Sequence, residues 1–534
     1  MCLTKLKEQL SGQIPLIEKV ALSLRSAIRD EVTKQQWPHL PSSQEETNTK
    51  ILYSVKRFLS CILTGEHTTS DVSERVRWLL SSLGQDLVYT VTCGKYKPPK
   101  HILLAAAVKA LTGNVELLQA LNRLGHCVSY SQVEENETAL CMRKLAASAG
   151  NKVVLPEETF PFLFTTMAWD NIDMLEETLT GAGTSHRVNG IIIQPRVYGP
   201  HQKPQQIPAM KKQKLRSIVV DDLNLPVYNS GDRTGPGLLL TAPEDTDHAH
   251  DTAFAKNLLW VLMRQAEQAN QDVCSWTGFN ILSRKGLEVN SDKIGYLPTI
   301  NAPATQLATC AEILEKSKDV MKQLNLETIV LVFDQALFAK VAEVMWKHKE
   351  RYRGIILRMG TFHTICNLLS ILGKRFQDAG LRDVCIESNI IAEGSVAAVM
   401  EGRQYNRAVR VHKCVYEALM RIAYRGFPEW LADNHPDKKA HLQQCLELIS
   451  DLHAEMNSTS YQETVVHPTF TSVAELFQEY LDHLRHHNGP LSSFWMSYVD
   501  IVESILLGLL RAAREGDWNL HMFAIQEMIV VLRI

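Results

Sequence analysis

The stretch TIVLVFDQALFAKVAEVMWKHKERYRGIILRMGTFHT, residues 328–364, predicts the fold of the centre of the chain. Residues 328–333 are a short apolar run rich in β-branched residues, which is typical of a strand covered on both faces in a parallel sheet. Residues 336–348 carry apolar side chains at helical spacing, and residues 354–357 form a second apolar run. The stretch therefore predicts a strand, a helix and a second strand.

Polar side chains follow both predicted strands. Asp334 comes directly after the first strand, and residues 358–363, which include His363, follow the second. In open α/β sheets, ligands and chemistry gather at the carboxyl ends of the strands, so we expect the carboxylate and the imidazole to share one rim. The alternative is local: Asp334 caps the next helix, and His363 caps or packs against the helix that follows it.

An earlier part of the chain has a similar pattern. Residues 160–169 form an apolar, β-prone run that ends at Asp170, with Asp173 three residues further on, and residues 188–193 form another apolar run. This predicts a strand, a polar excursion and a second strand. We expect the strands that end at Asp170 and Asp334 to be neighbours, while an Asx-turn is the alternative reading of the two early aspartates.

Composition sets broad limits on function. The 534 residues are 45% hydrophobic and 22% charged, which is ordinary for globular protein, and the formal net charge of −3 excludes a globally basic nucleic-acid binder. The 11 cysteines include no CxxC pair, which favours a reducing compartment. The N-terminus lacks an apolar signal core. We therefore expect no membrane association and a location in the nucleus or cytoplasm.

The periodicity predicts three regions. Residues 1–150 are expected to form a helical N-terminal region, in which residues 115–124 and a helix from Ser131 could form a weak helix-turn-helix. Residues 151–400 are expected to form an α/β core, with further short strands near residues 277–282. A flexible insertion rich in Pro, Gly and Lys interrupts this core at about residues 196–250. Residues 401–534 are expected to form a helical C-terminal region.

The acidic residues at the predicted strand ends suggest a metal site. RNase H-like nucleases and transposases hold two divalent ions with carboxylates from separate strand ends and a later helix, because hard cations prefer oxygen ligands. We predict Asp170, Asp334 and Glu393 as catalytic residues and Asp170, Asp173, Asp334 and His363 as ligands of Mg²⁺ or Mn²⁺. Glu401 and His186 are further candidates. The fold prediction is accordingly an α/β core of RNase H-like type, with helical N-terminal and C-terminal regions.

Basic residues near the C-terminal region suggest a nucleic-acid partner. Arg403, Arg407 and Arg410 are spaced to share one face of a predicted helix, and Lys374 and Arg375 lie upstream. Such a stripe without matched acids suits a phosphate backbone, although most charged stripes simply face solvent. The alternative function is therefore a catalytically inactive protein that binds nucleic acid or another protein. Oligomeric state, substrate and biological role have no signal in the sequence.

Four stretches also resemble a known family. They are WDNIDMLEETLTGAGTSHRVNG (169–190), VFDQALFAK (332–340), LRMGTFHT (357–364) and GKRFQDAGLR (373–382). They are similar to a family of uncharacterised, multicopy proteins of invertebrate and fish genomes that look derived from mobile elements. The resemblance runs from about Lys100 to the C-terminus and implies no established activity. Because members of that family are longer, it also implies that this chain is a C-terminally truncated copy.

Overall fold

The computed structural model describes most of the chain, and its contacts divide the protein into two compact units. The units are Met1–Glu157 with Gly199–Asn224, and Glu158–Tyr198 with Leu225–Ile534. The described residues are 2–31, 35, 37–39, 53–65, 73–147, 151–156, 159–178, 181–197, 212, 214–216, 225, 227–229, 246–265, 274–286, 291–454 and 457–533.

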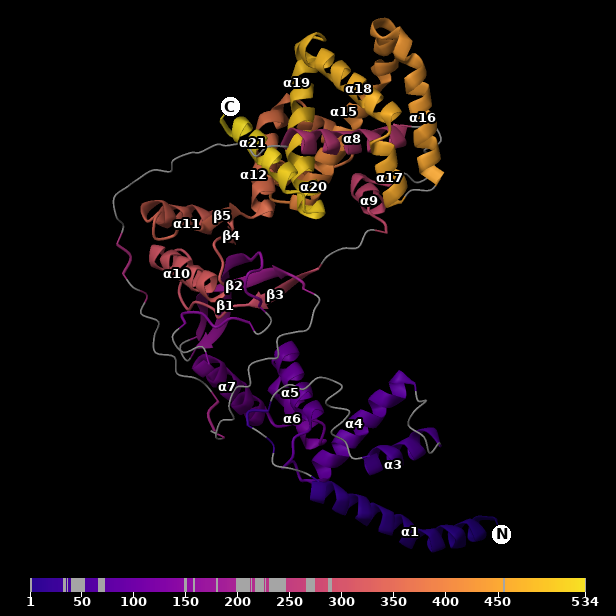
Figure 1. Ribbon diagram of the computed structural model, residues 1–534, viewed down its shortest axis with the longest axis vertical. Helices are drawn as coiled ribbons and strands as arrows, with labels where there is room; N and C mark the ends of the chain where they lie inside the picture. Colours follow the sequence, from indigo (N-terminus) through magenta and orange to yellow (C-terminus); the bar gives the residue numbers. More distant parts are fainter. Residues whose placement is uncertain are drawn as a thin grey trace. The chain divides into compact units, whose positions relative to one another are not determined.

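The first unit is helical in its described part, as predicted for residues 1–150 (Figure 1). Local signals set several helix ends: Pro99 begins one helix, Gly113 ends it in the left-handed region, and the Asn114 side chain caps the next helix by accepting from Leu117 N–H. Small clusters of buried residues around Leu118 and Val88 hold these helices together. The helices are α1 (Cys2–Glu31), α3 (Tyr53–Thr64), α4 (Glu74–Val91), α5 (Pro99–Thr112), α6 (Val115–Arg123) and α7 (Tyr130–Ala147).

The second unit contains a mixed five-stranded sheet with the order β3-β2-β1-β4-β5. Strands β1, β2 and β3 are successively antiparallel, and β4 is parallel to both β1 and β5. The strands are β1 (Thr166–Thr178), β2 (Gly181–Pro195), β3 (Asp292–Tyr296), β4 (Ile329–Phe333) and β5 (Ile355–Met359). An α/β core beside helical regions is therefore present, and the strand–helix–strand prediction for residues 328–364 is confirmed.

Two helices pack beside the sheet, α10 (Leu307–Gln323) and α11 (Gln335–Lys347) (Figure 1). The two sheet faces differ in burial because side chains alternate along each strand. Met167 and Trp169 of β1 and Leu331 and Phe333 of β4 are buried on one face. The opposite face carries half-buried side chains such as Ala168, which pairs with Val332. We call this less buried surface the site face.

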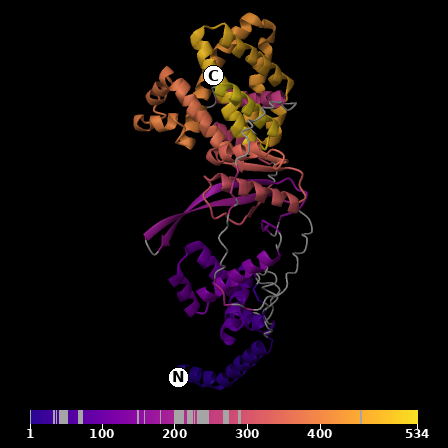
Figure 2. The same cartoon turned by 90° about the vertical axis from the view of Figure 1, so that its left-hand side faces the viewer.

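The hairpin of β1 and β2 is longer than the sequence indicated. The predicted polar excursion between the two strands is itself largely strand, and the hairpin extends beyond the other strands (Figure 2). Residues 170–173 include two aspartates and an asparagine, so their composition resembled a turn although the backbone continues its ladder of hydrogen bonds. Asp170 therefore lies inside β1 and not at its end.

Replacement of Gly190 with alanine is expected to destabilise the second unit by about 1–3 kcal/mol. Gly190 lies opposite Trp169 in the β1–β2 register, and a Cβ atom there would lie 2.6 Å from the indole ring. Trp169 is 1% exposed, so it has little room to move. Urea unfolding measures the effect. The matched control is Gly394→Ala, where a Cβ atom meets nothing within 4 Å; equal stability of the two variants would contradict the packing argument.

The rest of the second unit is a body of packed helices, called here the helical body (Figure 1). Its members are α8 (Thr246–Gln265), α9 (Trp276–Leu282), α12 (Thr361–Phe376), α13 (Leu381–Glu387), α14 (Glu393–Met400), α15 (Tyr405–Asn434), α16 (Lys439–Ala454), α17 (Ser458–Val465), α18 (Pro468–His486), α19 (Pro490–Asp500), α20 (Gly508–Glu515) and α21 (Trp518–Arg533). The π-helix η4 (Ile501–Leu507) joins α19 to α20. One large cluster of buried apolar residues, including Trp260, Tyr416 and Phe427, forms its core.

The structure corrects one secondary-structure prediction and leaves another outside its range. Residues 277–282, predicted as short strands, belong to helix α9, because Trp276 and Phe279 are buried at helical spacing against the core. Most of the predicted insertion at 196–250 lies outside the described residues, and α8 begins within it at Thr246. The prediction that the chain is helical after His363 is confirmed for the described residues.

One helical run, Pro490–Glu515, is long and apolar enough to pass a test for membrane spans. Its most apolar window is 67% buried inside the helical body, which is the behaviour of a core helix. Pro490 begins this run, and Gly516 follows it in the left-handed conformation. The run is therefore weak evidence for a membrane span.

Candidate functional site at the sheet edge

The structure places Asp170 and Asp334 on adjacent parallel strands, as predicted. Trp169 of β1 pairs with Phe333 of β4 at the last position of their register, and each aspartate is the next residue. Both aspartates follow the alternation of Ala168 and Val332, so both belong to the site face. Adjacent strands lie about 4.8 Å apart, which places the two residues at neighbouring backbone positions at one edge of the sheet.

Each aspartate keeps coordinating capacity in this position. One carboxylate oxygen of Asp334 accepts from Leu337 N–H at 2.7 Å and so caps helix α11, which confirms the capping role considered from the sequence. Asp170 is exposed, and its Oδ1 accepts from the adjacent Asn171 N–H at 2.8 Å. In both cases the hydrogen bond engages only Oδ1, so Oδ2 has no hydrogen-bond partner among the described residues.

His363 lies at the same rim. It is in the first turn of α12, which begins directly after β5. A Cβ atom added at Gly360 would lie 3.9 Å from both His363 Cδ2 and Val332 Cγ1. Because β4 and β5 are parallel and Gly360 N–H donates to Phe333 O at 2.8 Å, Asp334 and His363 both follow a strand end at the same edge of the sheet. The strand order is therefore consistent with the predicted sharing of one rim, although His363 forms no metal-binding group of three side chains with the aspartates among the described residues.

Asp173 lies apart from this group. It is three positions along β1 from Asp170, so its side chain projects from the opposite face of the hairpin. His186 of β2 is its cross-strand partner, with Nδ1 at 2.7 Å from Oδ1. The hydrogen bond with His186 lowers the pKa of Asp173. The two predicted site residues therefore pair with each other and not with Asp170.

The structure does not bring Glu393 or Glu401 to the two aspartates as a third ligand. Glu393 is the first residue of α14, is 78% exposed, and lies 3.7 Å from Arg382. Glu401 ends the same helix and pairs with Arg403 at 2.8 Å. Within the described part of the chain, no group of three His, Cys, Asp or Glu side chains is arranged to hold a metal ion. The acidic side chains at the rim are therefore a pair.

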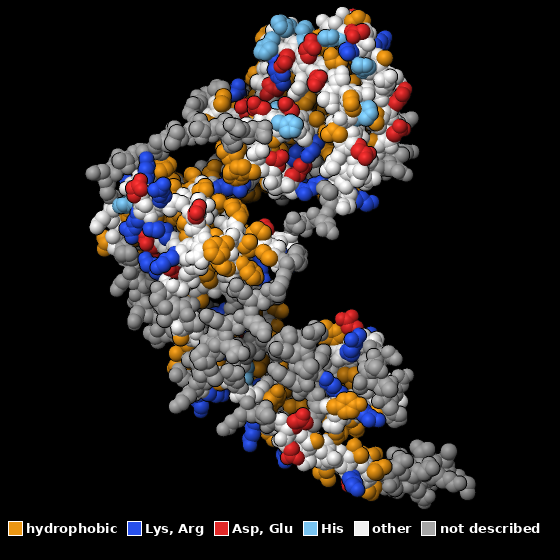
Figure 3. Space-filling view, in the orientation of Figure 1, with side chains coloured by type: hydrophobic (Ala, Val, Ile, Leu, Met, Phe, Trp, Pro, Cys, Tyr) orange, Lys and Arg blue, Asp and Glu red, His pale blue; other side chains and the backbone are white. Residues whose placement is uncertain are grey.

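The predicted basic stripe is shorter than expected. Arg403 precedes α15 and pairs with Glu401, so only Arg407 and Arg410 lie on that helix. Arg407 donates to Gln404. Lys374 and Arg375 occupy the last turn of α12, a favourable place for cations beside the helix dipole. Figure 3 shows acidic and histidine side chains mixed with basic ones on the visible face of the helical body, without a continuous basic surface.

Arg358 is a rim residue whose role the sequence did not indicate. It pairs with Val332, so it projects on the site face, one strand from Asp334. Its guanidinium lies over the Trp518 ring of α21 at 5.6 Å, and burial lowers its pKa. Burial, and secondarily the charge of Arg358, lowers the pKa of His521 to about 4. In the sequence, the only sign of a role for Arg358 is that it interrupts the apolar run IILRM. Its partners Trp518 and His521 come from the far end of the chain.

One protein-family model matches about half of the chain. Residues 275–533 match the model of a domain of unknown function (DUF8702). No curated protein and no solved structure matches the sequence. The matched region contains Asp334, Arg358 and His363, whereas Asp170 lies before it. This similarity carries no functional assignment.

Proposed function

We propose that the sheet and its rim form an RNase H-like domain that cleaves or transfers phosphodiester strands of nucleic acid with Mg²⁺ or Mn²⁺. The observation that carries this proposal is that Asp170 and Asp334 directly follow Trp169 and Phe333, the last paired residues of the parallel strands β1 and β4. The strand order supports it. RNase H-like domains have three antiparallel strands followed by two strands parallel to the first, with the order 3-2-1-4-5, and this sheet has that order and those directions.

The donor set at the rim suits a hard divalent cation. Mg²⁺ is typically bound by one or two carboxylates together with water and substrate phosphates, so a third protein carboxylate is not required. Asp170 and Asp334 would supply the carboxylate oxygens, and water and substrate phosphates would supply the rest. When bound, the metal activates the attacking oxygen and stabilises the leaving oxygen. Arg358 would add positive charge for a substrate phosphate on the same face.

This proposal extends to the biological setting. A nucleic-acid enzyme of this kind fits a mobile-element origin and a location in the nucleus or cytoplasm. The second candidate is a catalytically inactive nucleic-acid-binding protein. It is favoured by the absence of a third rim carboxylate among the described residues and by the cations Arg407 and Arg410 of α15. The two candidates differ in whether the aspartate pair binds metal.

Mn²⁺ or Mg²⁺ is expected to raise the melting temperature of the full chain and to support cleavage of labelled DNA or RNA. Binding to the folded state alone stabilises it by about 2.7 kcal/mol at a hundredfold excess over Kd. Asp170→Asn and Asp334→Asn should each abolish both effects. Asparagine caps helices as well as aspartate does, so the second variant keeps α11 intact.

Asp383→Asn is the matched control, because Asp383 is an exposed acid in the first turn of α13. It should respond to metal as the wild-type chain does. An unchanged melting temperature across millimolar metal, together with nucleic-acid binding that persists in EDTA, would favour the inactive binding protein.

A further inference from the structure

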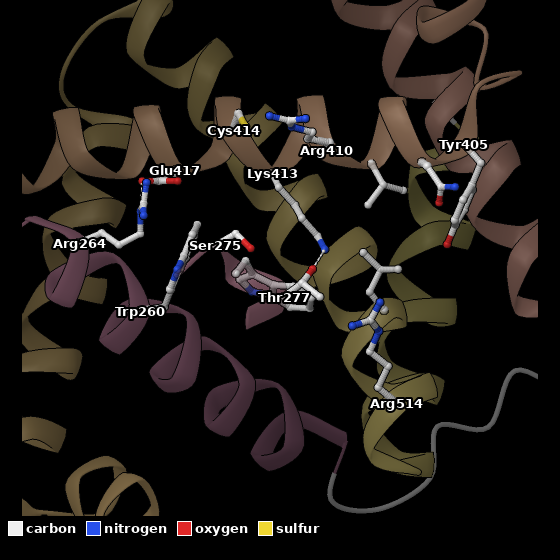
Figure 4. A pocket seen from close by; sticks show the side chains of 14 residues that line it. Trp260, Arg264, Ser275, Thr277, Tyr405, Arg410, Lys413, Cys414, Glu417 and Arg514 are labelled. Atoms are coloured by element: carbon white, nitrogen blue, oxygen red, sulfur yellow. Dashed lines mark hydrogen bonds and ion pairs between the residues drawn. The ribbon is translucent and has the colours of Figure 1, made fainter. Parts of the chain in front are cut away.

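A second candidate site lies inside the helical body, away from the aspartate rim, and Arg410 is one of the residues that line it. It is a cavity of roughly 530 Å³ between α8, the start of α9, α15 and α20 (Figure 4). This volume is within the usual range for small-molecule sites. We call it the basic cavity, after its charged lining residues Arg264, Arg410, Lys413, Glu417 and Arg514.

The charges of the basic cavity are unbalanced. Its single carboxylate, Glu417, is already engaged, with Arg264 Nε at 2.5 Å and Arg421 Nη1 at 3.5 Å. Arg410, Lys413 and Arg514 have no carboxylate within ion-pair distance in the described part of the chain. Three cations therefore line a partly enclosed space while none of them is paired with a carboxylate, which is an arrangement that an anion would stabilise.

Lys413 is the deepest of these cations. Its Nζ lies 4.1 Å from the centre of the Trp276 ring and donates to Thr277 Oγ1 at 3.1 Å. An ammonium has three donors, so this contact leaves capacity for a ligand. Burial, followed by the charges of Arg514 and Arg511, lowers the pKa of Lys413 to about 8. Figure 4 shows Lys413 and Arg514 directed into the same space, with the dashed line to Thr277.

The remaining lining residues indicate which chemical groups a ligand would have besides its negative charge. Val409 and Leu510 give an apolar surface, and the half-buried ring of Tyr405 stands at one end. The cavity is much larger than a phosphate ion. A flat heterocyclic group attached to a phosphate fits this combination of cations, apolar surface and an aromatic ring.

We propose that the basic cavity binds the phosphate of a nucleotide, with Lys413 and Arg514 as its ligands. The nucleotide is either free or the terminal nucleotide of a strand. Neither residue belongs to the aspartate rim, so the proposal does not depend on metal binding there.

Calorimetry of the full chain in EDTA at pH 7 tests the proposal with four probes: AMP, adenosine, inorganic phosphate and a 5′-phosphorylated oligonucleotide. AMP should bind, adenosine should not, and inorganic phosphate should bind more weakly than AMP. Equal binding of AMP and the oligonucleotide would identify a free-nucleotide site, whereas tighter binding of the oligonucleotide would identify a strand-end site. Both results support the proposal. Equal binding of AMP and adenosine would overturn it.

Lys413→Gln and Arg514→Gln should each weaken AMP binding at least about tenfold, because each removes a charge-assisted hydrogen bond. Arg514 is exposed, so its glutamine variant tests the cavity even if the Lys413 variant is poorly folded. Arg425→Gln is the control, because Arg425 is an exposed cation of α15 that does not line the cavity. Wild-type affinity in the Arg514 variant would contradict the proposal.

Discussion

Replacement of Arg511 with methionine is expected to destabilise the helical body by about 3–5 kcal/mol, the usual cost of breaking a buried ion pair. Arg511 is 2% exposed and donates to Asn280 at 2.6 Å, to Asn257 at 2.8 Å and to Glu515 at 3.0 Å. Its removal leaves these acceptors in a poorly solvated space. The guanidinium also joins α8, α9 and α20, so the loss reaches several helices.

Urea unfolding followed by circular dichroism measures the effect of the Arg511 variant. Arg425→Met is the matched control, since an exposed arginine should change stability by less than about 0.5 kcal/mol. The double variant with Glu515→Gln should lose less stability than the sum of the two single changes, because the residues are coupled. Additive effects would show that the ion pair is not a coupled part of the network.

The stability of the helical body is expected to fall as the pH is lowered from about 6.5 to about 4. Burial lowers the pKa of His412 from 6.5 to about 4, and its ring hydrogen-bonds to the Tyr498 hydroxyl at 2.7 Å. Between these pH values the unfolded chain binds a proton that the folded chain does not. The contribution of His412 to the free energy of unfolding is therefore complete above pH 6.5. It is lost at about 1.4 kcal/mol per pH unit as the pH falls, and the total loss is about 3 kcal/mol at pH 4.

His412→Gln should flatten this pH dependence while keeping a partner for Tyr498. The comparison is made between the variant and the wild-type chain, so other titrating groups, including His521, contribute equally to both. His486→Gln is the control, because His486 is exposed at the end of α18. Urea midpoints measured at several pH values give the slopes. Identical slopes for the His412 variant and the wild-type chain would contradict the assignment.

Local patterns predicted the sheet where apolar runs were distinct. Residues 328–333 and 354–357 are apolar runs rich in β-branched residues, and this pattern predicted their two strands. The apolar runs also predicted that the strands followed by Asp170 and Asp334 are neighbours. Residues 170–173 gave no such signal, because Asp and Asn are residues typical of turns. Helix α9 was misread because seven residues are too few to separate the two periodicities.

Long-range contacts explain what the sequence could not predict. Arg511 finds its asparagine partners in α8 and α9, and Trp518 reaches Arg358 from the last helix. The basic cavity joins Arg514 with Lys413 from helices far apart in the chain. The spacing of residues within a short stretch of sequence cannot reveal contacts between such distant segments. For the same reason, Glu393 was placed in the site by its order in the chain, although no described contact joins it to the aspartates.

The most direct test of the proposed function is anomalous diffraction from crystals grown with millimolar Mn²⁺. We expect an anomalous peak about 2.0–2.3 Å from carboxylate oxygens of both Asp170 and Asp334, which is the distance range for a hard cation on oxygen ligands. The peak should vanish in Asp334→Asn and persist in Asp383→Asn. Crystals of the wild-type chain with no peak at this rim at saturating Mn²⁺ would contradict the metal-dependent function.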